Sequence, residues 1–309
     1  MAAFVIRRVV HSVFVLWGVI TVIFVMMRVV PSDPASLLLG TSATPEEVHS
    51  LQMRLGLNQP LVTQYGHYFS GVLRLHFGSS YINGQSATHL VFERATASAY
   101  LAVVAAVLSV VVAMPLGILA ARYAGRWPDR LITTSSTVAQ AIPNFWLGIV
   151  FILIFARYLQ LVPGAGNATW DSVVLPAVAL SMPFIGILVR LLRGDMAEVL
   201  SQGYIQTARA KGLSEMRVLR DHAVRNSLVP VVTVAGLEIG TLLGGAVVTE
   251  TVFGWPGVGR LLVDSINTQD YSVVQAAVAF IAVIFIIVNL CVDLLYGVLD
   301  PRIRLAYAK

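Results

Sequence analysis

The chain has 309 residues, of which 57% are hydrophobic and 12% charged, with a formal net charge of +5. Its mean hydropathy is +0.79. Soluble domains are about half apolar and about a quarter charged, so this composition excludes an ordinary soluble protein and predicts a membrane protein. The single cysteine, Cys291, excludes a disulfide framework and a paired-thiol metal site.

Apolar runs long enough to form membrane-crossing helices occur at six places. A helix needs roughly 20 residues to cross the hydrocarbon core of a bilayer. The runs cover residues 9–30, 99–121, 131–156, 173–189, 228–248 and 273–298. We therefore expect an all-α membrane protein with six transmembrane helices. The first run is too long for the apolar region of a signal peptide, so we expect it to remain as a span.

Arginine and lysine are unevenly distributed among the connections between these runs. Fifteen of the 21 lie in the N-terminus, the second and fourth connections, and the C-terminus. Cationic loops resist translocation, so these segments are predicted to face the cytoplasm. Both termini are therefore expected on the cytoplasmic side of the plasma membrane. Because the cations follow the sides of a membrane and form no single patch, a nucleic-acid partner is not expected.

The segments outside the bilayer suggest a division of the chain. The first span and its cytoplasmic end occupy residues 1–30, an external helical segment 31–98, a five-helix core 99–298, and a cytoplasmic C-terminus 299–309. In the external segment, Thr44, Pro45 and Glu47 are typical of a helix start and Gly56 of a helix end. This external part either packs on the helix bundle or contacts a partner.

A second external loop, residues 249–272, follows the fifth apolar run. Its glycines and Pro256 indicate a tight path, and its later part has an amphipathic pattern. We predict that Phe253, Trp255 and Arg260 contribute to an external gate or to a contact with an external protein. A helix lying at the membrane interface is the alternative.

The fourth connection, residues 190–227, differs in character from the apolar chain around it. The pattern of residues 203–225 is a short helix, a turn at Gly212, and a second helix capped by Ser214. In the second helix, Met216, Leu219 and Ala223 are predicted to form an apolar stripe. Arg217, Asp221 and Arg225 stand at the helical spacing of ion pairs. A short exposed helix backed by a second one suits insertion into a groove of another protein, although a basic cytoplasmic loop is the simpler alternative.

The stretch "YIQTARAKGLSEMRVLRDHAVRNSLVPVV" resembles the EAA loop in permease subunits of ATP-binding-cassette importers. The stretches "VVPSDPA", "LGLNQPLVTQY", "GGAVVTETVFGWPGVGRLL" and "NLCVDLLYGVLDPRIR" extend the resemblance, specifically to the bacterial dipeptide and oligopeptide branch, along nearly the whole chain. Gln206, Thr207 and Ala208 occupy the Glu-Ala-Ala positions and Gly212 the glycine. Only Ala208 and Gly212 keep the general motif, and Ser32 stands where glycine is usual.

The resemblance implies a type I importer permease fold and a coupling helix that docks into a groove of an ATPase subunit. Its contacts would come from Tyr204, Ile205, Gln206, Thr207, Ala208, Arg209, Ala210, Lys211, Gly212 and Glu215. The resemblance also implies a second homologous permease subunit, two ATPase subunits that hold ATP and Mg²⁺, and an external binding protein or lipoprotein. No cofactor is expected in this chain itself.

Polar residues within the apolar runs are candidates for the translocation path, since ionisable groups at membrane depth usually face a bundle interior or a cavity. Glu238 lies near Gly240, Gly244 and Gly245, whose small surfaces allow helices to approach closely. Gln140 and Asn144 flank a proline in the third run. A structural hydrogen bond or ion pair within the bundle remains the alternative for all three.

Motifs for chemistry are absent from the sequence. There is no phosphate-binding loop of the GxxxxGK type followed by Ser or Thr, so ATP must be hydrolysed by another subunit. There is also no HExxH metal site and no GxSxG nucleophile turn, and the chain is not expected to be an enzyme. The sequence therefore predicts a permease for di- or oligopeptides. Nickel, glutathione, opine or haem are alternative cargoes, and a proton-coupled carrier or a non-transporting scaffold are the alternative classes.

Overall fold

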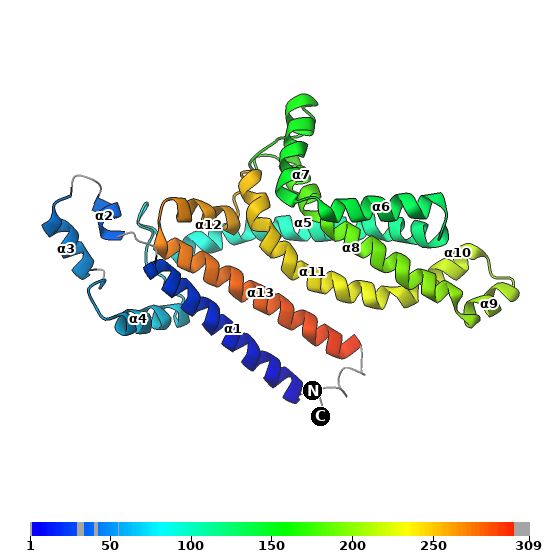
Figure 1. Ribbon diagram of the computed structural model, residues 1–309, viewed down its shortest axis with the longest axis horizontal. Helices are drawn as coiled ribbons and strands as arrows, with labels where there is room; N and C mark the ends of the chain where they lie inside the picture. Colours follow the sequence, from blue (N-terminus) through cyan, green and yellow to red (C-terminus); the bar gives the residue numbers. More distant parts are fainter. Residues whose placement is uncertain (1, 30–33, 40–42, 55, 300–309) are drawn as a thin grey trace. The chain divides into compact units, whose positions relative to one another are not determined.

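The computed structural model describes residues 2–29, 34–39, 43–54 and 56–299. Throughout these ranges the regular elements are helices (Figure 1), and an isolated bridge joins Ser79 and Ser86. The predicted all-α class is therefore confirmed. Ser32 and nearly all of the predicted C-terminal segment 299–309 lie outside the described residues.

The helices follow one another with short connections. The α-helices are α1 (Ala2–Val29), α2 (Pro34–Leu39), α3 (Pro45–Arg54), α4 (Leu61–Leu73), α5 (Ala87–Arg122), α6 (Trp127–Ala141), α7 (Asn144–Phe151), α8 (Val174–Ser201), α9 (Gly203–Ala210), α10 (Glu215–Arg217), α11 (Arg225–Val252), α12 (Val258–Asn267) and α13 (Tyr271–Leu299). Two π-helical turns, η1 (Ile152–Tyr158) and η3 (Val218–Val224), and one 3-10 turn, η2 (Trp170–Val173), complete the order.

Four described helical segments are long and apolar enough to cross a membrane by themselves. They are Ile6–Met27, Ala87–Arg122, Trp170–Ser201 and Tyr271–Val292. Two bent pairs bring the number to six if each pair is one span: Trp127–Ala141 with Asn144–Tyr158, and Pro230–Leu242 with Gly244–Val252. Every predicted apolar run falls on one of these segments or pairs.

The third predicted span is sharply broken. Its two halves, α6 and the α7–η1 segment, meet at 101°, and α7 turns away from α6 in Figure 1. The break follows from Pro143, because a proline disfavours the helical conformation of the residue before it. Ile142 accordingly has an extended backbone, with φ −86° and ψ 126°. Gln140 and Asn144 therefore lie at the two helix ends that face the break.

The chain folds as two compact units, one built around Ala99–Trp255 and the other around Ile6–Ser98 and Pro256–Ile287. The second unit has an apolar core to which Leu90, Val91 and Val273 contribute. It also includes parts of both predicted external segments. There the buried hydroxyl of Ser80 donates a hydrogen bond to the buried carboxylate of Asp270.

Helix α3 in the external segment begins as predicted. The Thr44 backbone N–H donates to Glu47 Oε2 at 2.8 Å, and the Thr44 hydroxyl donates to the same oxygen at 2.9 Å. In return the Glu47 N–H donates to Thr44 Oγ1 at 3.3 Å. This is a reciprocal capping box, which satisfies backbone donors that a helix start otherwise leaves open. Gly56, with φ +69°, lies just beyond the helix.

The capping box makes α3 sensitive to acid. The two hydrogen bonds from Thr44, first that of its backbone N–H, hold the pKa of Glu47 below its ordinary value. A depressed carboxyl pKa stabilises the folded state above the ordinary value of about 4.3 and loses that contribution as the pH falls through the lower folded-state pKa. We expect hydrogen-exchange protection of residues 45–54 to decrease on acidification below that value. Glu47→Gln should abolish this dependence and Glu46→Gln should retain it; equal behaviour of the two variants would contradict the assignment.

Helix α8 is the centre of the first unit, where it packs against α6, α7 and α11. A Cβ at Gly186 of α8 would lie 2.5 Å from the backbone oxygen of Ser136 in α6. A Cβ at Gly117 of α5 would lie 2.8 Å from the Leu192 side chain. Glycine therefore lets α8 approach the α6 backbone at Gly186, and at Gly117 it leaves room for the Leu192 side chain. Helix α8 also runs to Ser201, well beyond the predicted end of its span at Val189, so Arg190 and Arg193 belong to the helix and not to a loop.

Candidate functional site: the helix–turn–helix segment after α8

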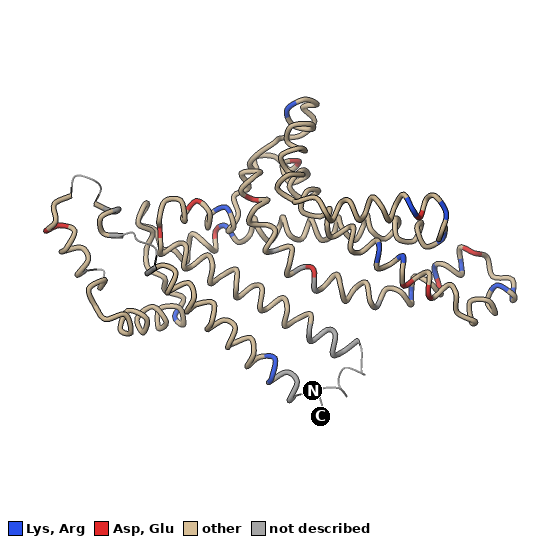
Figure 2. Tube along the Cα trace, in the orientation of Figure 1, with Lys and Arg blue, Asp and Glu red and all other residues tan. Residues whose placement is uncertain are grey.

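The segment that follows α8 has the predicted order of helix, turn and helix. Gln202 adopts an extended conformation with ψ 147°, which ends α8 and starts α9. Helix α9 is short and lies at the far end of α8 in Figure 1, and charged residues gather along α9, α10 and the adjoining turns in Figure 2. The charged stretch of residues 203–225 therefore forms separate short helices beyond the end of α8.

Helix α9 rests on an apolar base. The Ile205 side chain is fully buried, and so are Val218 and Ala223 on η3, with Leu219 4% exposed. Helix α9 contacts both α8 and η3. Ile205 was predicted to contact an ATPase directly. The structure corrects this, because its side chain is buried where α9 packs against α8 and η3.

Tyr204, near the start of α9, makes two further contacts that hold this helix in place. Its hydroxyl accepts a hydrogen bond from Asn226 Nδ2 at 2.9 Å. Its ring meets His222 edge to face, with 6.5 Å between the ring centroids. The Tyr204 side chain is still 46% exposed, so it contributes to both the base and the outer surface.

The turn after α9 is made by Gly212 and closed by an ion pair. Gly212 has φ +83°, a conformation that glycine adopts without strain, and there is open space around the position of its missing Cβ. Arg209 on α9 forms two hydrogen bonds to the Glu215 carboxylate, at 2.8 and 3.2 Å. The predicted glycine turn is thus present, and the ion pair joins the helices on its two sides.

The second helix departs from the predicted register. Met216 is 66% exposed, whereas Val218 and Leu219 are buried. Asp221 pairs with Arg220, at 2.7 Å, and not with Arg217 or Arg225. Val218 and Leu219 belong to the π-helical turn η3, which packs against α8 and α9, whereas Met216 precedes that turn on α10. The hydrogen bonds from Arg220 hold the pKa of Asp221 below its ordinary value.

The outward surface of α9 is polar and contains small side chains. Exposed positions are Gln206, Thr207, Arg209, Ala210, Lys211 and Gly212, and Ala208 is half-buried. Glu215 is exposed beside them, where it pairs with Arg209. Except for Ile205, the predicted docking residues therefore lie on the surface of α9, the turn after it and the start of α10.

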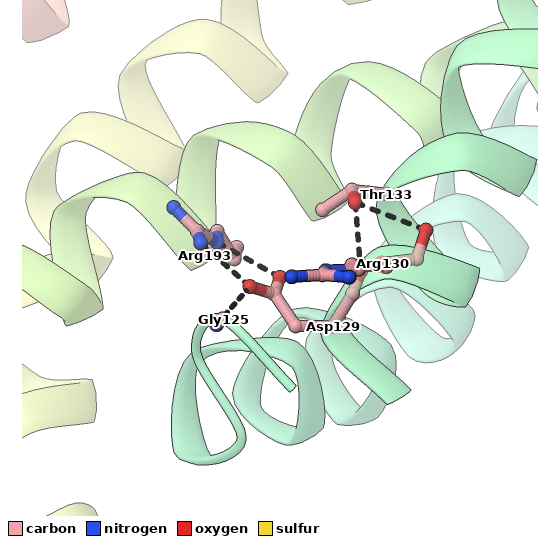
Figure 3. Close-up of polar contacts among 5 residues, drawn as sticks. All are labelled: Gly125, Asp129, Arg130, Thr133 and Arg193. Carbon is pink, nitrogen blue, oxygen red and sulfur yellow. Dashed lines mark hydrogen bonds and ion pairs between the residues drawn. The ribbon is translucent and has the colours of Figure 1, made fainter. Parts of the chain in front are cut away.

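Sequence reasoning missed an ion pair that stiffens the support of this segment. Arg193 on α8 donates from Nε to Asp129 Oδ1 at 3.0 Å and from Nη2 to Asp129 Oδ2 at 2.6 Å. Figure 3 shows Asp129 between Arg193 and Gly125, whose backbone N–H also donates to Oδ2, at 2.7 Å. Asp129 is 3% exposed. This buried carboxylate fixes the turn between α5 and α6 to the part of α8 that leads into α9. The available sequence signal was an acid beside a predicted span, which did not identify its partner.

The polar residues at membrane depth occupy separate places. Gln140 Oε1 accepts a hydrogen bond from Arg190 Nη2. A Cβ at Gly245 would lie 3.5 Å from Asn144 Nδ2, so Asn144 is close to α11. Glu238 Oε2 accepts a hydrogen bond from Thr241, one turn along the same helix, at 2.6 Å. Arg190 is therefore the hydrogen-bond partner of one of the three residues predicted for the translocation path.

The residues predicted at the external gate serve different purposes. Phe253 is 1% and Trp255 3% exposed. A Cβ at Gly148 would lie 2.9 Å from the Phe253 ring, and Trp255 stacks on Tyr100 with 6.2 Å between the ring centroids. In the first unit these two aromatics are core residues, which argues against a surface contact with an external protein; their predicted part in an external gate stays a prediction. Arg260 is partly exposed and lies 3.5 Å from the Asp264 carboxylate, so it remains a candidate for such a contact.

A cavity of about 510 Å³ lies between α5, α6 and α8. Its lining is mainly aliphatic, with Ser135 and Ser136 of α6 among the residues around it. Sites for polar ligands combine apolar walls with placed polar groups. This cavity has few such groups, so we do not assign the translocation path to it.

The described helices include up to six candidate membrane spans, one of them sharply broken, which is the architecture of an integral membrane protein, and comparisons with known proteins identify its family. The chain belongs to the family described as "Binding-protein-dependent transport system inner membrane component", which it matches over residues 113–305. Its residues 1–102 match the N-terminal part of the same type of membrane component. The protein is therefore a permease subunit of an ATP-binding-cassette importer.

Two relatives support this assignment, and two solved structures show the fold. The chain is 39% identical to a probable peptide ABC transporter permease protein of Sinorhizobium fredii, over 98% of this chain and 100% of the relative. It is 38% identical to the glutathione transport system permease protein of Escherichia coli K12, over 98% of this chain and 99% of the relative. The MetNI methionine ABC transporter in an inward-facing conformation has a TM-score of 0.55 and 17% identity, covering 68% of this chain and 96% of that chain. An amino acid ABC transporter has a TM-score of 0.52 and 14% identity, covering 67% and 93%. The last two comparisons show that the fold is that of importer permeases.

Proposed function

We propose that this permease carries di- or oligopeptides across the plasma membrane, that both of its termini are cytoplasmic, and that α9 is its coupling helix. In this proposal two separate ATPase subunits bind ATP and Mg²⁺ and hydrolyse the ATP. A second, homologous permease subunit completes the path, and an external binding protein or lipoprotein delivers the cargo. ATP-dependent movement of the ATPases then biases the bundle between inward-open and outward-open states.

The observation that carries the docking proposal is the fixed base of α9. Ile205 is fully buried, Tyr204 is held by Asn226, and Arg209 is paired with Glu215. A helix that transmits movement between proteins must resist displacement relative to its own support. The outer surface of α9, with Thr207, Ala208 and Gly212, is small enough to enter a groove.

The peptide cargo rests on different support. One relative of similar length is named a peptide permease and another a glutathione permease. Glutathione is itself a peptide-like molecule with amine, amide and carboxylate groups. These names agree with a peptide cargo and make glutathione the alternative to test beside it.

The docking role is tested by enlarging the outer surface of α9. We expect Ala208→Glu to abolish co-purification of the ATPase subunits with the permease and to abolish ATP-dependent uptake of a labelled dipeptide in reconstituted vesicles. Gly212→Asp should have the same effect, because an aspartate at φ +83° strains the turn. Ala168→Glu introduces the same side chain at an exposed alanine after η1 and is expected to change neither measurement.

The outcomes separate docking from cargo. Retention of the ATPases by Ala208→Glu with full uptake would reject α9 as the docking helix. Co-purification by the wild type with uptake of glutathione but no dipeptide would keep the coupling role and replace the cargo. Dipeptide uptake that does not depend on ATP would reject the proposed mechanism.

A further inference from the structure

Arg190 occupies an unusual place on α8. It lies inside a helical segment that is apolar and long enough to cross a membrane, and its side chain is exposed in this chain. An arginine at this position normally extends toward the nearer water phase. Arg190 instead donates a hydrogen bond to Gln140, in the last turn of α6 before the break.

The direction of the Arg190 side chain follows from the contact between α6 and α8. The two helices meet where Gly186 faces the backbone oxygen of Ser136. Both Asp129 and Arg193 lie two turns from that contact, about 10 Å along each helix, on the side that leads to α9. Arg190 lies one turn from the Gly186–Ser136 contact on the same side, toward α9. Gln140 lies one turn from that contact on the opposite side, toward the break. The Gln140 side chain extends to the contact, because its Nε2 would lie 3.1 Å from a Cβ at Gly186, and the Arg190 guanidinium points back along α8, away from α9, to meet it there.

The Arg190 guanidinium, within a candidate membrane span, needs polar groups around it. Charged side chains within membrane segments face a bundle interior or a water-filled cavity, because exposure to lipid is costly. Gln140 supplies one acceptor oxygen, but its own Nε2 is buried and has no hydrogen-bond partner in the described part of the chain. The C-terminal end of a broken membrane helix presents carbonyl acceptors, and only N-terminal ends present backbone donors. The donors at the C-terminal end of α6 are therefore the side chains of Arg190 and Gln140.

Glu238 lies at a similar depth on α11. Helices α8 and α11 meet where a Cβ at Gly245 would be 3.4 Å from the Leu180 side chain. Distances along the two helices can be compared from that contact. Gly186 lies about 9 Å from it along α8, toward the end that leads to α9. Glu238 lies about 8–10 Å from it along α11 in the same direction, with the bend in α11 included. The Glu238 carboxylate and the Arg190 guanidinium therefore lie at similar distances from the α8–α11 contact, within the same unit.

We propose that Arg190 binds the C-terminal carboxylate of a peptide in transit, while Glu238 receives its amino terminus. Guanidinium and carboxylate form paired, charge-assisted hydrogen bonds, which are stronger than those between neutral groups. The two opposite charges at one depth match a zwitterion, whereas a metal ion would be repelled by Arg190. This inference rests on the proposed peptide cargo and names the residues that read its ends.

The test compares two peptides that differ at one end. ATP-driven uptake of labelled alanyl-phenylalanine and of its C-terminal amide is measured in vesicles that contain the complete complex. Each peptide is supplied at a concentration that saturates the binding protein, as determined by separate titration. The variants are Arg190→Gln, Arg190→Lys, Gln140→Ala and the control Arg126→Gln, which makes the same change at an exposed position before α6. Co-purification of the ATPases reports whether each variant assembles.

We expect Arg190→Gln to lower uptake of the free acid about ten-fold and to leave uptake of the amide unchanged. Arg190→Lys and Gln140→Ala keep the cation and should keep the preference for the free acid, and Arg126→Gln should match the wild type. Equal losses for both peptides, or no loss for either, would overturn the inference while leaving the peptide cargo intact. Absence of ATP-dependent uptake of either peptide by the wild type would overturn the proposed cargo and this inference with it.

Discussion

Asp129→Ala is expected to destabilise the folded permease by about 2–4 kcal/mol, because the replacement leaves the Arg193 guanidinium without its acceptor in a largely buried place. Asp129 has 4% and Arg193 33% of its side chain exposed, so the expected cost lies toward the lower end of the range for buried pairs. The Gly125 N–H also loses its acceptor, at 2.7 Å. The measurement is the midpoint of thermal unfolding of the purified protein in detergent.

The control is another arginine–carboxylate pair of the same unit. Arg209 and Glu215 have a similar geometry, but 41% and 57% of their side chains are exposed. Glu215→Ala is therefore expected to cost less than about 1 kcal/mol. The double variant Asp129→Asn with Arg193→Met removes both charges and should recover part of the loss. If Asp129→Ala shifted the midpoint no more than Glu215→Ala does, the ion pair in Figure 3 would not be a stabilising element.

Local signals predicted much of this fold. Apolar runs of sufficient length became helices, Thr44 and Glu47 formed the expected cap, and Gly212 formed the expected turn. Pro143 marked the break in the third span because its effect acts on the residue immediately before it. In these cases the physical cause lies within a few residues of the structure that it produces.

Features that depend on packing were not predictable in the same way. The pairing of Asp129 with Arg193 and the direction of Arg190 result from the meeting of α6 and α8. Met216 lies outward although the neighbouring Val218 and Leu219 are buried, because these two residues belong to η3, which packs against α8 and α9. Phe253 and Trp255 looked like loop residues, but their burial depends on Gly148 and Tyr100 far away in the sequence.

Gly186→Ala is expected to force α6 and α8 apart and to lower uptake more than any conservative change elsewhere on α8. The new Cβ would lie 2.5 Å from the Ser136 backbone oxygen and 3.0 Å from Gln140 Cγ. A backbone oxygen within a helix cannot turn aside, so the helices must shift, at a cost of about 1–3 kcal/mol. That shift also displaces the partners of Arg190 and Arg193, because both reach across this contact to α6.

Gly194→Ala is the matched control, since it adds the same methyl group to the same helix where nothing lies within 4 Å. It should retain wild-type stability and uptake. The two alanine variants are compared by thermal unfolding in detergent and by ATP-driven dipeptide uptake. Equal values for both would mean that α6 and α8 do not touch at Gly186. Loss of uptake in Gly186→Ala with unchanged stability would instead show that the spacing of these helices matters to the path itself, because Gln140 and Arg190 meet only when α6 and α8 are this close.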